Sequence, residues 1–135
     1  MDHKEMLQRN DDHVRGFVVK HIGNPQRLGR ALFKWEYDHI KKSYDDLPVE
    51  ISDADCALRA LSRASYQIGM YSVDHVNVLP HVACVKAMFG AFGACAQIAI
   101  TQKRSAFWKS IQNSVGKNMN SVSYTHLRAH ETSID

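Results

Sequence analysis

This sequence predicts an all-α protein, a small bundle of four to five helices. Apolar residues recur at intervals of three and four along most of the chain, the spacing that places them on one face of a helix. Gly-Asn-Pro at 23–25 and Leu-Pro at 47–48 interrupt this pattern and separate the predicted helices. Helices that each carry one apolar face bury it by packing together as a bundle.

The first helix is expected over residues 2–22. Its apolar positions are Met6, Leu7, Val14, Phe17, Val18 and Ile22. Gly23 should end this helix in the left-handed conformation, because glycine adopts it without steric cost. Asn24 is then the N-cap of the next helix, and Pro25 occupies its first turn. The connection between the first two helices should therefore be tight.

The second helix is expected over residues 25–45, with two adjacent apolar stripes. One stripe consists of Leu28, Leu32, Trp35 and His39, and the other of Phe33, Tyr37, Ile40 and Tyr44. His39 and His21 both fall on apolar stripes, where a histidine is usually a hydrogen-bonded core residue. Ser52 should cap the third helix, whose apolar positions are Ala57, Leu58, Leu61, Ala64, Ile68 and Tyr71.

Residues 72–78 are expected to be a connector, with a weak strand alternative in Val73, Val76 and Val78. The fourth helix should span about 78–101 and is apolar around most of its surface. One narrow stripe differs and consists of Lys86, Gly90, Gly93, Gln97 and Thr101. A last helix should run from about Ser105 to Gly116, and its predicted buried face is Phe107, Trp108, Ile111 and Val115.

The fourth helix also offers a membrane alternative. Residues 79–100 are long enough to span a bilayer, and Lys103 and Arg104 would form a positive flank. Pro80, Lys86 and other polar residues interrupt the segment, so we favour a packed core helix. The small residues Gly90 and Gly93 would let a second backbone approach closely, which makes their stripe a candidate homo-oligomer contact.

Residues 121–132 stand apart from the rest of the chain. The eleven residues Val-Ser-Tyr-Thr-His-Leu-Arg-Ala-His-Glu-Thr, after a compatible Ser121, resemble one reading frame of a transposase-based sequencing adapter. This resemblance implies that residues 121–135 are a non-native tail and that the natural stop codon was not reached. Residues 1–120 would then be a single helical domain or the N-terminal fragment of a longer protein, and His126 and His130 belong to no site. We recognise no family in residues 1–120.

Charge is unevenly distributed along residues 1–120. Residues 1–74 hold eleven Lys or Arg and twelve Asp or Glu, whereas residues 75–120 hold five basic residues and no acid. Such asymmetry favours a nucleic-acid, membrane or acidic-protein partner. Three cysteines, an odd number, together with a charged N-terminus, favour reduced core thiols in a cytoplasmic protein.

The basic C-terminal third mixes cations with aromatic rings, as nucleic-acid grooves do for phosphates and bases. We expect nucleic-acid contacts from Lys103, Arg104, Trp108, Lys109 and Lys117. An alternative is that Phe107 and Trp108 are buried and that the cations are only the solvated side of this helix. The sequence therefore predicts a small bacterial binding or regulatory protein rather than an enzyme, with no cofactor.

Glu36 and His39 form a Glu-x-x-His pair, which di-iron bundles place on one helix face. Those sites need two such pairs and two further glutamates, and Glu5 and Glu50 are the only other glutamates before residue 121. A metal-binding bundle or enzyme fragment using Glu36 and His39 is therefore a second alternative. The sequence contains no P-loop, nucleophile elbow, Cys-x-x-Cys or dinucleotide fingerprint.

Overall fold

A computed structural model describes residues 2–102 and 111–116 and confirms the small all-α bundle. Four long helices follow one another: α1 (His3–Lys20), α2 (Pro25–Tyr44), α3 (Asp53–Asp74) and α4 (His81–Gln102). A shorter helical segment covers residues 111–116, within the range predicted for the last helix. No strand occurs among these described residues, so the strand alternative at 73–78 is wrong.

The predicted caps are confirmed at the starts of α2 and α3. The Asn24 side chain accepts a hydrogen bond from the backbone N–H of Arg27 at 3.1 Å, with Pro25 in the first turn. The Ser52 hydroxyl accepts one from the N–H of Asp55, also at 3.1 Å. Gly23 has φ of 85°, the left-handed conformation expected for the residue that ends the first helical segment. Each cap satisfies a backbone donor that the helix itself leaves unpaired.

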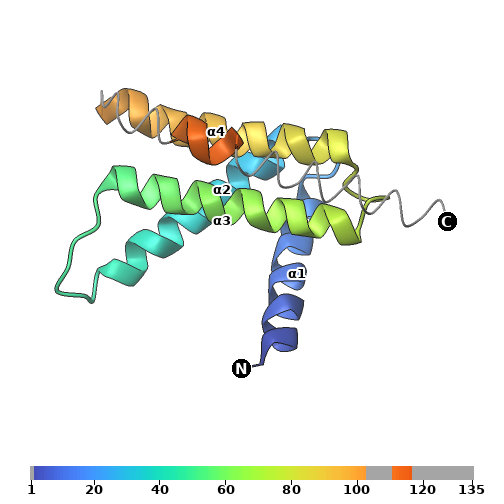
Figure 1. Cartoon of the computed structure of the whole chain (residues 1–135), viewed down its shortest axis with the longest axis horizontal. Coiled ribbons are helices and arrows are strands. Elements are labelled where there is room, and N and C mark those ends of the chain that lie inside the picture. Colours follow the sequence, from blue (N-terminus) through green and yellow to red (C-terminus); the bar gives the residue numbers. More distant parts are fainter. Residues whose placement is uncertain (1, 103–110, 117–135) are drawn as a thin grey trace.

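In the bundle, α3 and α4 lie side by side, α2 crosses behind them, and α1 stands across the other helices with its N-terminal half projecting away (Figure 1). The core lies between α2, α3 and α4. Its fully buried side chains include Leu28 and Leu32 of α2, Leu61 and Ile68 of α3, and Met88 of α4, together with Ile111 of the short segment. Removing apolar surface from water contributes about 25 cal/mol per Å², and this is the main free-energy term that stabilises such a core.

The crossing of α2 and α4 depends on two glycines. A Cβ atom added at Gly29 would lie 1.7 Å from the carbonyl oxygen of Ala87, and one added at Gly90 would lie 2.1 Å from that of Gln26. The two helix backbones therefore approach so closely that neither position has room for a methyl group. Gly90 is thus buried within this chain, whereas Gly93 is exposed and has open space around it.

The connector between α3 and α4 lies further along the chain than predicted, over residues 75–80 instead of 72–78. α3 continues to Asp74 rather than ending near residue 71, and α4 begins at His81 rather than 78. The Ser72 hydroxyl donates to the carbonyl oxygen of Leu79, and the N–H of His75 donates to the carbonyl of Tyr71, so this turn folds back on α3. Pro80 sets the start of α4, because its ring disfavours the helical conformation of the residue before it.

The three cysteines, Cys56, Cys84 and Cys95, are buried free thiols, as predicted. Burial raises the pKa of Cys84 to about 11 and that of Cys95 to about 12, so both stay protonated at neutral pH. In the short segment 111–116, Ile111 and Val115 are buried as expected, and Ser114 lies 3.2 Å from Ser62 of α3. Phe107 and Trp108, also predicted to be buried, lie outside the described residues.

Candidate functional site

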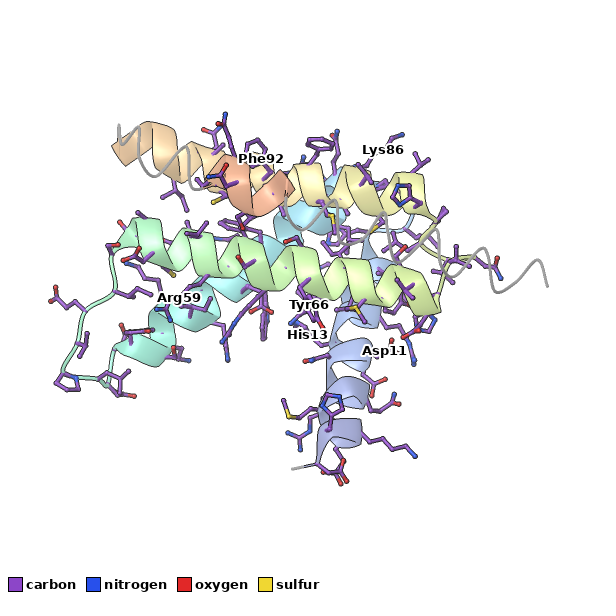
Figure 2. All side chains as sticks on the ribbon, viewed as in Figure 1. Asp11, His13, Arg59, Tyr66, Lys86 and Phe92 are labelled. Carbon is purple, nitrogen blue, oxygen red and sulfur yellow. The ribbon has the colours of Figure 1, made fainter. Side chains whose placement is uncertain are left out.

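The predicted nucleic-acid contacts lie outside the described residues. This holds for Lys103, Arg104, Trp108, Lys109 and Lys117. The described cation of the basic C-terminal third is Lys86, which is exposed on the side of α4 that faces away from α3 (Figure 2).

A polar groove lies where α1, α2 and α3 meet, and we call it the three-helix groove. Its volume is about 570 Å³, within the usual range of small-molecule sites. It is lined by Arg9, Asn10 and His13 of α1, Trp35, Glu36 and His39 of α2, and Arg63 and Gln67 of α3. None of these side chains is aliphatic, which distinguishes the groove from a lipid pocket. A smaller pocket of about 160 Å³ lies next to it, between α1 and α3.

Glu36 forms the most buried part of this groove and is 2% exposed. It lies one helical turn from both Leu32 and Ile40, so α2 places its carboxylate in line with core residues. Its nearest charge partner is Arg63, whose Nη1 lies 3.8 Å from Oε2, beyond hydrogen-bonding distance. A buried carboxylate needs hydrogen bonds to offset its desolvation, and no described side chain donates one to Glu36.

His13 lies where α1 reaches the other helices (Figure 2), and it lines the same groove as Glu36. Its ring contacts Phe17 edge-on, with ring centroids 5.2 Å apart, and Trp35 at 4.2 Å. The Nε2 atom of His13 is buried and has no hydrogen-bond partner in residues 2–102 and 111–116. Burial lowers the pKa of His13 from 6.5, and the nearby Glu36 carboxylate opposes this effect.

The lowered pKa of His13 predicts a pH-dependent stability. Because the unfolded chain binds this proton more tightly than the folded one, the free energy of unfolding should decrease as pH falls below about 6.5. Urea unfolding of the wild type and of His13→Gln at pH 7.5, 6.5 and 5.5 measures this contribution. The variant should lose less stability over this range, although His21, whose pKa is also lowered by burial, remains. Parallel curves for the two proteins would contradict the expectation.

Trp35 and His39 form the exposed wall of the groove. Their rings are stacked, with centroids 4.8 Å apart and planes 10° apart, and Trp35 is 41% exposed. Of the predicted stripe, Leu28 and Leu32 are buried as expected, whereas the predicted burial of Trp35 and His39 is wrong, because the buried face of α2 continues through Glu36 instead. His39 is an exposed ring rather than a core residue, and His21 is only half-buried.

Sequence reasoning did not find the groove as a whole. His13, Arg63 and Gln67 come from two helices other than α2, and their spacing along the chain gives no sign that they converge. A usable signal was present for Glu36, since it lies four residues from Leu32 and from Ile40 on what is otherwise an apolar line. A lone carboxylate in such a line indicates either a buried ion pair or a site.

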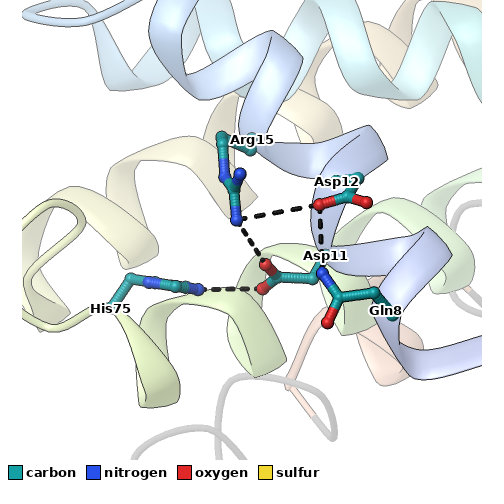
Figure 3. A network of polar contacts seen from close by, with 5 residues as sticks. All are labelled: Gln8, Asp11, Asp12, Arg15 and His75. Atoms are coloured by element: carbon teal, nitrogen blue, oxygen red, sulfur yellow. Dashed lines mark hydrogen bonds and ion pairs between the residues drawn. The ribbon is translucent and has the colours of Figure 1, made fainter. Parts of the chain in front are cut away.

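A second polar network fixes α1 beside α3. The Asp11 carboxylate lies 2.9 Å from Nε2 of His75, the residue that follows α3, and 3.2 Å from Arg15 (Figure 3). Gln8 and Arg15 both contact Asp12 in the same network. His75 also stacks on Tyr71, with centroids 4.2 Å apart. These contacts hold α1 at the position where it closes one side of the three-helix groove.

The metal alternative is not supported by the residues that the structure describes. Among them, no group of three or more His, Cys, Asp or Glu side chains is placed to hold a metal ion. Glu36 and His39 do line one groove, as their spacing predicted. His13 lines the same groove, but the guanidinium group of Arg63 lies 3.8 Å from the Glu36 carboxylate and its positive charge disfavours a cation there.

α4 passes the length and composition criteria for a membrane span, as the alternative over 79–100 anticipated. The window His81–Ile98 has a mean hydropathy of 1.3, and 39% of it is buried inside the bundle. Its buried side includes Cys84, Ala87 and Ala91, which pack against α2 and α3. This packing buries one face of α4, and the choice between a core helix and a membrane-associated helix stays a prediction. Of the stripe proposed for self-association, Gly93 remains open to a second chain, whereas Gly90 is occupied by α2.

Comparisons with known proteins find no relative of this chain. No protein-family model matches the chain, and neither a curated protein nor a solved structure does.

Proposed function

We propose that this protein acts by binding, as a small cytoplasmic regulatory or accessory protein that contacts nucleic acid through its basic C-terminal third. The observation that carries this proposal is the run from residue 75 to 120, with five basic residues and no acid. Phosphate backbones attract such a segment at long range, and each neutralised phosphate releases a condensed counterion. The same basic residues would also attract a nucleic-acid-handling protein that has an acidic surface.

Two features of the described residues support an acidic partner. Lys86 is exposed on α4 and forms no ion pair within the described part of the chain. Lys20 and Arg27 lie close enough to His21, at the turn between α1 and α2, to help lower its pKa after the effect of burial. Positive charge is therefore concentrated at this turn as well as in the C-terminal third.

A triple variant tests the contribution of the C-terminal cations. Replacing Lys103, Arg104 and Lys109 by Ala should weaken binding to a labelled single strand by about tenfold or more at low salt. The slope of log K against log salt should become shallower by about 2, because each lost phosphate contact removes about 0.7. Fluorescence anisotropy over a salt series measures both quantities.

The matched control removes three exposed lysines elsewhere. Replacing Lys4, Lys34 and Lys42 by Ala gives the same change of net charge on α1 and α2. The salt slope of this control should stay close to that of the wild type. If the two triple variants lose affinity and slope equally, only net charge matters and the C-terminal third is not the binding surface.

A further inference from the structure

The three-helix groove holds two oxygen acceptors that lack donors. The Glu36 carboxylate is 2% exposed, and its nearest cation, Arg63, is 3.8 Å away. The Oε1 atom of Gln67 is buried and has no hydrogen-bond partner among the described residues. Leaving such groups unsatisfied destabilises the folded protein, so a ligand that offers N–H donors here would recover that free energy.

The rim of the groove has the opposite character. Arg9 and Arg63 are exposed guanidinium groups on either side, and Arg9 forms no ion pair with a described residue. Arginine binds phosphate and carboxylate groups through paired N–H donors. A ligand that fits both regions therefore carries N–H donors at one end and an oxyanion at the other.

The stacked rings of Trp35 and His39 restrict the ligand further. Both rings line the groove beside the acceptors, and none of the described residues that line it has an aliphatic side chain. Aromatic side chains stack well with planar heterocycles, nucleobases among them. The ligand is thus a planar ring rather than a flexible amino acid or polyamine.

We infer that the three-helix groove binds a guanine base with its phosphate. Guanine has two adjacent N–H donors on its pairing edge, at N1 and N2, which suit the Glu36 carboxylate and the Gln67 oxygen. Its O6 acceptor suits the unpartnered Nε2 of His13 when that atom carries the proton. Adenine presents an acceptor at N1 instead, which the carboxylate repels. Arg9 at the rim then contacts the phosphate, whereas Arg63 stays beside the Glu36 carboxylate.

The same chemistry is offered by free guanosine monophosphate and by a guanine within a single strand. Calorimetric titration of the full chain with guanosine monophosphate and adenosine monophosphate tests the free nucleotide. A thymine strand with one central guanine, compared with an all-thymine strand, tests the single strand. The strand titrations use the Lys103, Arg104 and Lys109 triple Ala variant, so that the groove is measured without the C-terminal cations.

We expect at least one guanine ligand to bind about tenfold or more tightly than its matched partner without guanine. Glu36→Gln should remove this preference, because an amide places an N–H donor where the ligand needs an acceptor. Glu50→Gln, the same change at an exposed position between α2 and α3, should leave it unchanged. Gln67→Met provides a second groove variant if Glu36→Gln does not fold, and it should also weaken the preference.

Preference for the free nucleotide assigns a mononucleotide site, and preference for the guanine strand alone assigns a single-strand site. Equal binding of guanine and adenine ligands overturns the inference, as does a guanine preference that survives both groove substitutions. No binding of any of these ligands also overturns it. These results are independent of the proposed function, because the C-terminal variant isolates one surface from the other.

Discussion

Gly29→Ala is expected to destabilise this protein by about 3 kcal/mol or more, a large part of the stability of a domain of this size. The new methyl group would lie 1.7 Å from the carbonyl oxygen of Ala87 and 2.9 Å from the backbone nitrogen of Ala91. Since both atoms belong to the α4 backbone, no side-chain rotation can relieve the overlap. α2 and α4 must separate, which opens the core on both sides of the crossing. Gly90→Ala should have a comparable effect from the other helix.

Two other glycines provide the control for this prediction. A Cβ atom added at Gly16 in α1 or at Gly93 in α4 would have nothing within 4 Å. Alanine favours the helix over glycine by up to about 1 kcal/mol, so Gly16→Ala and Gly93→Ala should stabilise the protein slightly. Chemical denaturation of all four variants measures the difference. Equal effects at Gly29 and Gly93 would show that the α2–α4 crossing is wrong.

Leu61→Ala is expected to cost about 2–5 kcal/mol. Leu61 is completely buried in the middle of α3, where that helix faces the core shared with α2 and α4. Truncation removes apolar burial and leaves a cavity that surrounding helices fill only in part, because protein cores are close-packed. The denaturation midpoint should fall, whereas the slope of the unfolding free energy against denaturant concentration should change little.

Leu47→Ala is the matched control, since it makes the same chemical change at a leucine that is 52% exposed in the connection between α2 and α3. Its cost should stay within about 0.5 kcal/mol, as for most surface substitutions. A large loss at Leu47 together with a small one at Leu61 would contradict the described core.

Local signals in the sequence predicted the fold well. Asn24 and Ser52 cap their helices, and Gly23 has the left-handed conformation, because these roles depend on a few neighbouring residues. The apolar positions of α3 from Ala57 to Tyr71 are buried or half-buried for the same reason: one face of a long helix is defined by its own spacing.

The features that depend on contacts between helices were not predictable in this way. On α2, the choice between burying Trp35 and burying Glu36 depends on where α1 and α3 pack, and the chain alone does not specify that. The spacing places Gly90 with Lys86 and Gly93 on a stripe that is a candidate homo-oligomer contact, yet α2 occupies it. The convergence of His13, Glu36 and Gln67 likewise follows from three helix positions together.

The two proposed binding surfaces consist of different residues. The three-helix groove is formed by α1, α2 and α3, and α1 is held there by the Asp11–His75 contact of 2.9 Å. The basic C-terminal third begins after α3 and includes Lys86 of α4. Substitutions in one should therefore leave binding at the other intact, provided that the bundle remains folded.

The salt dependence of nucleic-acid binding tests the central claim most directly. If Lys103, Arg104, Lys109 and Lys117 each neutralise one phosphate of a single strand, log K should fall with log salt at a slope of about −3 for the full-length chain. Anisotropy of a labelled single strand between low and physiological salt measures this slope. A slope between 0 and −1, or no binding at low salt, would contradict nucleic-acid binding through the basic C-terminal third.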